Sequence, residues 1–251
     1  TKVLLTLAPT ATAGYTFNID PSNPFLSPAQ QAAFFGPGAQ INDGSGVATD
    51  PTARAGTSVI GIRRRITETP GRVEPYTTNS YQFVGGFRGD IGTSLKWDVF
   101  AQYGKVTRRL ELLNDLSYSA LAQALDVVSG PNGPVCFDPS NGCVPLNLFG
   151  TTPIPASQLA FVIKDGSERT TIKQFVAGGN ISGDVPFLKS PFASGPAAFS
   201  AGVEYRSEKG STLVDSAYAS GDLIYYGQGQ NITGKYHVAE IYGELKVPIV
   251  Q

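Results

Sequence analysis

The sequence predicts an all-β chain whose strands cross a bilayer as part of an antiparallel β-barrel, and two patterns support this. Six stretches of about ten residues alternate apolar and polar side chains, whereas strands of soluble proteins usually have about five or six residues. A tilted strand needs about ten residues to cross a bilayer. The connections between these stretches also alternate between short and long, as they do in outer-membrane barrels.

Composition fits such a chain and excludes several other classes. Charged residues make up 16% of the 251 residues, below the roughly 25% usual for soluble domains. The net charge of −1 provides no basic field for nucleic acid. The longest apolar runs are far shorter than the roughly 18 residues of a membrane helix. The mean hydropathy of −0.05 suits strands with one apolar face, although a soluble β-sandwich would show the same average.

The first third of the chain is expected to be mostly irregular. In order, we expect a partial strand over 2–8, a loop over 9–56, a strand over 57–67, a turn at 69–72 and a strand over 79–90. Pro, Gly, Ala and Asn dominate the loop, and Thr69-Pro70-Gly71-Arg72 has the chemistry of a turn. The strand over 79–90 places Tyr81, Phe83 and Phe87 on one face.

The rest of the chain alternates strands with connections of very different length. In order, we expect a turn at 91–94, strands over 95–109, 171–185, 196–209 and 235–250, long connections over 110–170 and 210–234, and a turn over 186–195. The clearest alternation sets Leu95, Trp97 and Val99 against Lys96 and Asp98. Within the first long connection, helical spacing predicts helices over 117–128 and 155–162.

The lengths of the connections predict an orientation. Short turns at 91–94 and 186–195 alternate with the long loops 110–170 and 210–234. Since outer-membrane barrels have short periplasmic turns and long extracellular loops, we expect both long loops to be extracellular. The segment 9–67 does not fit this alternation, and its side stays unassigned.

The two faces of the expected strands carry opposite chemistry. The positions expected to face lipid are Val99, Ala101, Phe175, Ile181, Val203, Ile241 and Leu245. The positions expected to face the lumen include Glu204, Arg206, Glu240 and Glu244. Charges of both signs on one face imply a lumen that is filled with water or with a plug. A solvent-exposed sheet face of a soluble protein would have a similar pattern.

Several motifs resemble those in the barrel of TonB-dependent outer-membrane receptors, in a subgroup common in alphaproteobacteria. They are Asn23-Pro24-Phe25; Arg64-Arg65, Pro70-Gly71-Arg72 and Asn79-Ser80-Tyr81; Gly85-Gly86-Phe87-Arg88-Gly89-Asp90 with Trp97-Asp98; Cys136 and Cys143-Val144-Pro145-Leu146-Asn147-Leu148-Phe149-Gly150; Gly195-Pro196 through Tyr205-Arg206; and Gly234-Lys235-Tyr236 through Lys246-Val247-Pro248. Their order and spacing over nearly the whole chain carry the resemblance.

The resemblance implies a barrel of about 22 strands with a plug domain inside it. It also implies energised uptake of a scarce solute such as a siderophore, a corrinoid or a carbohydrate, with no enzymatic activity and no cofactor. The expected partners are outer-membrane lipid, the protein's own plug and the TonB complex. The chain shows neither plug nor energy-coupling box, and it opens and closes on strand-like residues. We therefore expect an internal piece with six or seven strands, which would form an open curved sheet if isolated.

The two cysteines predict a local disulfide. Six residues separate Cys136 from Cys143, and the turn-forming sequence Pro139-Ser140-Asn141-Gly142 lies between them. Loops of outer-membrane proteins form in an oxidising compartment, where disulfides persist. A metal site would need more ligands, and the single histidine, His237, lies far away in the sequence.

The candidate ligand contacts in the loops are Tyr218, Tyr225 and Tyr226, whose rings could stack on a solute. A place in the aromatic girdle of the membrane or in loop packing would explain them equally well. Two other functions stay open for the chain. One is a secreted soluble β-sheet module for carbohydrate binding or adhesion. The other is a passive porin, which the great length of the 110–170 connection disfavours.

Overall fold

The computed structural model describes residues 17–39, 41, 54–60, 64 and 66–250, so the partial strand expected over 2–8 lies outside the described residues. The chain divides into two compact units. The sheet unit consists of residues 76–110, 168–214 and 230–251. The loop unit consists of residues 1–75, 111–167 and 215–229.

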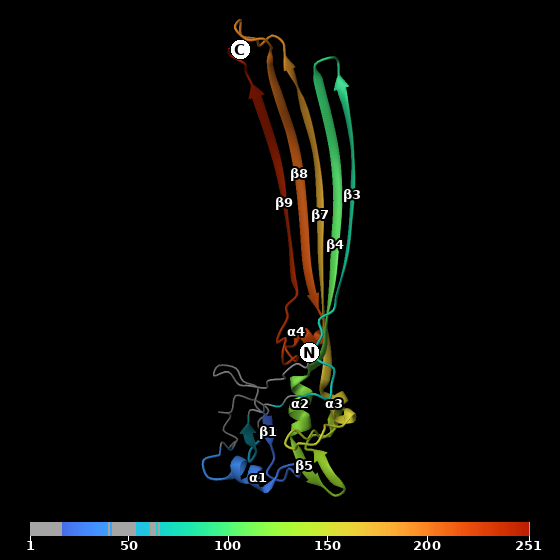
Figure 1. The fold of residues 1–251 in the computed structure, drawn as a ribbon, viewed down its shortest axis with the longest axis vertical. Helices are drawn as coiled ribbons and strands as arrows, with labels where there is room; N and C mark the ends of the chain where they lie inside the picture. The colour runs from blue at the N-terminus through green and yellow to red at the C-terminus, as the bar shows by residue number, and fades with distance from the viewer. Residues whose placement is uncertain (1–16, 40, 42–53, 61–63, 65, 251) are drawn as a thin grey trace. The chain divides into compact units, whose positions relative to one another are not determined.

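The sheet unit is a five-stranded sheet (Figure 1). Its strands are β3 (Tyr76–Ile91), β4 (Leu95–Leu116), β7 (Ile163–Val185), β8 (Ala197–Val214) and β9 (Ile232–Lys246), in the spatial order β3-β4-β7-β8-β9. The pairs β3–β4, β7–β8 and β8–β9 are antiparallel. These five strands were all predicted, but four of them extend further than expected at the end that leads to a long connection. The strand expected over 235–250 ends earlier than predicted, at Lys246.

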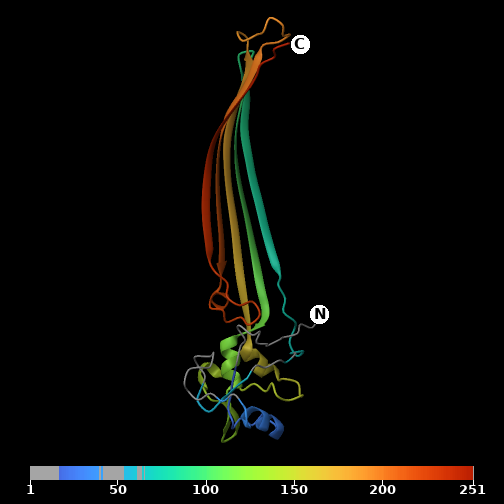
Figure 2. The same ribbon diagram turned by 90° about the vertical axis from the view of Figure 1, so that its left-hand side faces the viewer.

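The sheet is curved and open (Figure 2). Strands β3 and β9 form its two edges, and within the described residues neither edge pairs with a further strand. The antiparallel, unclosed sheet agrees with the expected open curved sheet. An edge strand exposes a row of unpaired backbone N–H and C=O groups, which readily accepts another strand.

Short turns join the strands at one end of the sheet. Gly92, with φ 65°, permits the tight turn between β3 and β4. The turn between β7 and β8 is closed by hydrogen bonds from the Leu188 N–H to the Val185 carbonyl at 2.9 Å and from the Ala197 N–H to the Leu188 carbonyl at 2.8 Å. At the other end, residues 117–162 and 215–231 connect the strands, so the predicted alternation of short and long connections is confirmed.

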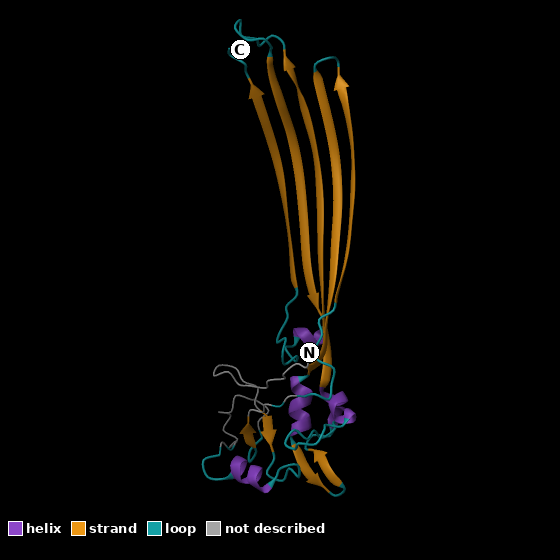
Figure 3. Cartoon of the chain, in the orientation of Figure 1, coloured by secondary structure: helices purple, strands orange, loops and turns teal. Residues whose placement is uncertain are grey.

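All helices of the described residues belong to the loop unit (Figure 3). The elements of the two long connections are α2 (Tyr118–Leu125), β5 (Val127–Gly130), β6 (Gly133–Cys136), the short 3-10 helix η1 (Ser140–Gly142), α3 (Ala156–Val162) and α4 (Ser216–Ala219). The helices expected over 117–128 and 155–162 are confirmed as α2 and α3. Helix α2 begins after Ser117, whose hydroxyl accepts a hydrogen bond from the Ala120 N–H.

Two expectations for the first third of the chain are wrong. The expected loop 9–56 contains the strand β1 (Phe17–Ile19) and the helix α1 (Pro28–Phe35). The expected strand 57–67 shortens to β2 (Ser58–Ile60), which pairs with β1 and not with the large sheet. Arg64, Ile66 and Thr67 are not in a strand, and residues 61–63 and 65 lie outside the described residues. Of this part of the chain, Phe17, Ile19 and Ile66 are buried in the core of the loop unit.

The hydrophobic core lies in the loop unit. The fully buried residues that share it come from β1, from α2 and α3 and from the segment between them: Phe17, Ile19, Leu121, Ala124, Leu125, Leu146 and Val162. The Phe17 and Tyr118 rings lie 5.8 Å apart. The described part of 17–60 therefore packs on residues 117–162, which assigns this segment to the unit of the long connections.

Candidate functional site

The five-stranded sheet has two chemically distinct faces, which the registers define. Residues paired across an antiparallel ladder share a face, and consecutive residues lie on opposite faces. Val203 pairs with Ile241, and Glu204 pairs with Glu240. Val203 and Ile241 therefore lie on the opposite face from the two glutamates, as the sequence predicts. The paired residues of β3–β4, β7–β8 and β8–β9 all have equal parity, and Gln102 of β4 contacts Gln174 of β7. Odd-numbered residues therefore share one face of the sheet and even-numbered residues the other.

The odd-numbered face, hereafter the apolar face, is an extended surface of exposed and half-buried apolar side chains. It carries Phe83, Phe87, Trp97, Val99, Phe175, Ile181, Phe199, Val203, Ile241 and Leu245. Phe87 is 76% exposed and Ile241 is 88% exposed. Contiguous exposed apolar surfaces of this kind mark contact with another protein, with a ligand or with a membrane.

A shallow apolar hollow of about 410 Å³ lies across β4, β7, β8 and β9, toward the end of the sheet with the short turns. Val99, Ile181 and Val203 are among the residues that line it, and glycines contribute to its floor. A Cβ added at Gly179 would come within 3.1 Å of Val99 Cγ1, so a larger residue there would press on the valine. The glycine keeps this part of the apolar face low and smooth.

The even-numbered face, hereafter the polar face, carries hydrogen bonds between strands. The amide of Gln102 donates to Gln174 at 3.2 Å, and the amide of Gln174 donates to Glu208 at 2.8 Å. Arg206 forms an ion pair with Glu204 at 2.7 Å. The four residues expected to face the lumen, Glu204, Arg206, Glu240 and Glu244, are all on this face.

Aromatic rings on the polar face cover glycines of neighbouring strands. The Phe100 ring lies against Gly178, so that a Cβ there would approach Phe100 Cε1 to 2.8 Å. The Tyr242 ring covers Gly202 in the same way, and the Tyr242 hydroxyl accepts a hydrogen bond from the Asn180 amide at 3.2 Å. Aromatic residues paired with glycine on an adjacent strand fix register. This explains why Phe100 interrupts a row of polar side chains.

In the loop unit, Arg54 joins three separate parts of the chain. Its guanidinium contacts the carboxylate of Asp20 at 2.8 Å and that of Asp126 at 2.6 Å. It also lies 3.6 Å from the centre of the Phe137 ring. The arginine therefore ties the segment after β1 to the end of α2 and to the segment that follows β6.

The pKa values of the two carboxyl groups bound by Arg54 shift in opposite directions. Burial would raise the pKa of Asp20, but hydrogen bonds from Ser22 and Arg54 hold that pKa below its ordinary value. Burial dominates at Asp126 and raises the pKa of its carboxyl, although Arg54 opposes this effect. The charge of Arg54 thus stabilises two partly buried acids, and the arginine is the main support of the cluster.

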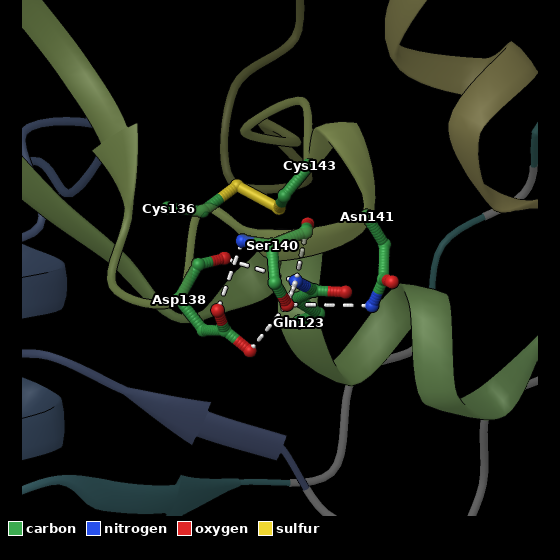
Figure 4. The surroundings of a disulfide bond; sticks show 6 residues. All are labelled: Gln123, Cys136, Asp138, Ser140, Asn141 and Cys143. Carbon is green, nitrogen blue, oxygen red and sulfur yellow. Dashed lines mark hydrogen bonds between the residues drawn. A yellow bond between two sulfur atoms is a disulfide. The ribbon is translucent and has the colours of Figure 1, made fainter.

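The disulfide between Cys136 and Cys143 is present, with the two Cα atoms 6.3 Å apart (Figure 4). Within its loop the carboxylate of Asp138 accepts hydrogen bonds from the Ser140 N–H and hydroxyl, both at 2.9 Å, and these bonds lower the pKa of Asp138. The amide of Gln123 in α2 donates to the carbonyls of Asp138 at 3.0 Å and Ser140 at 2.9 Å. The loop is therefore closed covalently and also bound to α2.

Tyr225 is the most accessible of the three candidate tyrosines. It is 61% exposed, and its ring lies 5.0 Å from the Tyr226 ring. The Arg72 guanidinium lies 3.8 Å from the centre of the Tyr225 ring, so part of this aromatic surface is already in contact with a cation. Tyr226 is half-buried, and burial together with the negative charges of Glu74 and Asp115 raises the pKa of its hydroxyl.

A buried carboxylate lies beneath these tyrosines, in the part of β4 that belongs to the loop unit. Asp115 is fully buried, and its Oδ2 atom accepts a hydrogen bond from the Tyr225 N–H at 3.0 Å. Its other oxygen lies 3.8 Å from the Arg72 guanidinium. Burial raises the pKa of Asp115 in spite of these partners. Sequence reasoning missed this arrangement because Arg72 and Asp115 come from separate segments.

Tyr218 has a packing role in α4. A Cβ at Gly229 would come within 2.6 Å of the Tyr218 ring, and the Gly229 N–H donates to the Tyr218 carbonyl at 2.9 Å. The ring therefore closes the connection between β8 and β9. Among the three tyrosines, Tyr225 is therefore the one whose ring is largely exposed.

Within the described residues, no group of three or more His, Cys, Asp or Glu side chains is arranged to hold a metal ion. Nor does any described helix combine the length and apolar character required to cross a membrane. Comparisons with family models, with curated proteins and with solved structures find no match for the chain.

Proposed function

We propose that this chain forms part of the barrel of a TonB-dependent outer-membrane transporter, which imports a scarce solute. The two-faced sheet carries the proposal. Five long neighbouring strands bear apolar side chains on one face and hydrogen-bonded side chains with charges of both signs on the other. In the proposed barrel the apolar face contacts lipid and the polar face lines the lumen.

The height of the apolar band supports this assignment. Along β8 the odd-numbered residues from Ala197 to Tyr205 are apolar or aromatic, and the two ends lie eight residues apart. At about 3.4 Å per residue this stretch spans roughly 27 Å. A strand tilt of about 40° reduces the span to roughly 21 Å along the membrane normal, close to the apolar band of about 25 Å in outer-membrane barrels.

The unpaired edges of β3 and β9 support a larger assembly of strands. Unsatisfied backbone groups cost several kcal/mol each in hydrocarbon, so a sheet in a membrane must close on itself. Further strands beside β3 and β9 would complete the barrel. The proposed gating by a plug and coupling to TonB follow from the family resemblance of the motifs quoted above.

The loop unit is proposed as the extracellular, solute-facing part. Long connections without a fold of their own are usually functional or disordered. The loop unit, which contains both long connections, has its own buried core and a disulfide. The exposed Tyr225, with Arg72 at one side of its ring, is the proposed contact for an organic solute. An ordered extracellular unit of this kind presents a fixed surface to a ligand.

The decisive experiment concerns the full-length protein that contains this chain. We expect it to fractionate with the outer membrane, to require detergent for extraction and to migrate faster on a gel before heating than after. A monodisperse monomer in detergent-free buffer with a cooperative unfolding transition would refute the proposal and favour the soluble module. Solute uptake that is unchanged in cells without TonB would instead indicate a passive porin.

A further inference from the structure

Four lysines lie side by side on the apolar face, at the end of the sheet where the long connections begin. Lys173 pairs with Lys209, and Lys209 pairs with Lys235. Phe100 of β4 lies against Gly178 of β7, and Lys105 and Lys173 each lie five residues from that contact toward this end of the sheet. Lys105 therefore belongs to the same row. We call Lys105, Lys173, Lys209 and Lys235 the lysine row.

The lysine row has no counter-charge in the sheet. Among the ladder-paired residues of the five strands, all of which the structure describes, no Asp or Glu lies on the apolar face. None of the four lysines forms an ion pair with another described residue. Three of the four are exposed, and Lys105 is half-buried. Like charges directly opposite one another destabilise a sheet. A bound external anion would reduce this repulsion between the lysines.

An aromatic row lies next to the lysines, toward the apolar band. Tyr103 and Phe175 each lie two residues from their strand's lysine. Tyr205 links this row laterally, with its ring 6.4 Å from the rings of both Phe175 and His237. Apolar band, aromatic row and cationic row thus follow one another along the strands. Aromatic residues collect where hydrocarbon meets headgroups, so in the proposed barrel the lysine row would lie at headgroup level.

We propose that the lysine row binds the phosphate groups of anionic lipid headgroups in the leaflet at the long-connection end, the outer leaflet. This inference rests on the proposed function, because it requires the apolar face to contact lipid. Lysine ammonium groups bind phosphate as point charges. A spacing of about 4.8 Å between neighbouring strands lets one phosphate contact two lysines. The apolar surface below the row then contacts the acyl chains of the same lipid.

The test compares phosphorylated and dephosphorylated lipid A binding to the delipidated full-length protein in neutral detergent, measured by native mass spectrometry. The test variant carries Lys105→Gln, Lys173→Gln, Lys209→Gln and Lys235→Gln. The matched control removes four cations from the polar face: Arg88→Gln, Lys96→Gln, Arg108→Gln and Lys246→Gln. A lysine at a membrane surface contributes about fivefold to anionic lipid binding, so loss of the row should weaken binding of the phosphorylated lipid at least about tenfold.

We expect the control variant to bind like the wild type and the wild type to prefer the phosphorylated lipid. Equal binding by the lysine variant, or equal binding of both lipids by the wild type, would overturn the inference. If the lysine variant does not fold, binding of the phosphorylated lipid to the wild type is measured at rising salt concentration, and binding that does not weaken overturns the inference. Displacement of the lipid by inorganic phosphate at equal concentration also overturns it, because that result shows a site for free anions. Failure of the wild type to insert into phosphatidylcholine vesicles would separately refute the proposed function.

Discussion

Substitution of Ile241 by arginine separates a lipid-facing sheet from a soluble one. The Ile241 side chain is 88% exposed on the apolar face of β9. In water, a substitution at so exposed a position changes the free energy of unfolding by no more than about 0.5 kcal/mol. In a bilayer, arginine at the midplane of the lipid-facing surface costs about 2–4 kcal/mol.

The depth of Ile241 follows from its distance to the lysine row. Ile241 lies six residues from Lys235 along β9, which is roughly 20 Å at about 3.4 Å per residue. A strand tilt of about 40° gives roughly 15 Å along the membrane normal. Because the lysines would lie just outside an apolar band of about 25 Å, this distance would place Ile241 near the midplane of the proposed barrel. We therefore expect the full cost of about 2–4 kcal/mol for Ile241→Arg.

The assay is urea unfolding of the full-length protein in vesicles, followed by the heat-sensitive gel mobility. The control is Thr233→Arg, on the same face and strand but beyond Lys235, where arginine should cost no more than about 1 kcal/mol. Equal costs at the two positions, or a cost below about 0.5 kcal/mol for Ile241→Arg, would show that the apolar face does not contact lipid.

Three further predictions concern the loop unit. Replacing Cys136 and Cys143 by serine should remove about 2–3 kcal/mol of local constraint and weaken solute capture without affecting membrane insertion; unchanged binding and uptake would make the disulfide a passive staple. Arg54→Ala leaves two partly buried carboxylates without their cation and should destabilise the loop unit by about 2–4 kcal/mol, seen as faster limited proteolysis; unchanged proteolysis would contradict this. Because the pKa of Asp138 is lowered in the fold, its contribution is present above the ordinary carboxyl pKa of about 4 and is lost as pH falls through the lower folded value. Hydrogen exchange of this loop should thus show a local loss of protection on acidification, beyond the intrinsic change in exchange rate, that Asp138→Asn lacks.

The strands could be predicted from the sequence wherever their two faces differ in polarity. The prediction over 95–109 finds β4, but the strand continues to Leu116, and β7 begins at Ile163 and not near 171. In the extension of β4 polar and apolar residues no longer alternate, since Leu112 and Leu113 are consecutive apolar residues and Asn114 and Asp115 are consecutive polar residues. Backbone pairing such as Glu168 with Val214 extends β7, and the hydrophobic pattern does not report it.

The loop unit could be predicted only in part. Helix α1 has a local signal that the sequence reading missed: Ser27 and Gln30 form a capping box, with Pro28 at the first helical position. The strand β1 has no such signal, because three residues are too few to show a period. Phe17 is buried through Tyr118 and its neighbours, about a hundred residues later in the chain. Contacts at such separation depend on the fold and not on local pattern.

In the candidate site, too, features set by neighbouring residues could be predicted, and features that join distant segments could not. The turn chemistry around Ser140 predicts the disulfide, which the structure contains. The Arg54 cluster and the Arg72–Asp115–Tyr225 contact each join distant segments, so they could not be predicted. The lysine row is intermediate. The sequence shows each lysine within its strand, but its alignment with the other lysines depends on the register between strands. A register shift of two residues would destroy the alignment and still leave every side chain on the same face of the sheet.

In the proposed function, depth in the membrane determines where the apolar band, the aromatic row and the lysine row lie along the strands. The lysine row crosses the strands at one level because the registers of β7, β8 and β9 place Lys173, Lys209 and Lys235 opposite one another. A soluble sheet has no reason to align lysines in this way, since their mutual repulsion opposes folding. In a membrane, the type of residue that is favoured at a position depends on its depth, and neighbouring strands reach the same depth at the same level of the sheet. The alignment of like charges across strands is therefore a cost in the isolated sheet and a favourable feature beside a layer of phosphates.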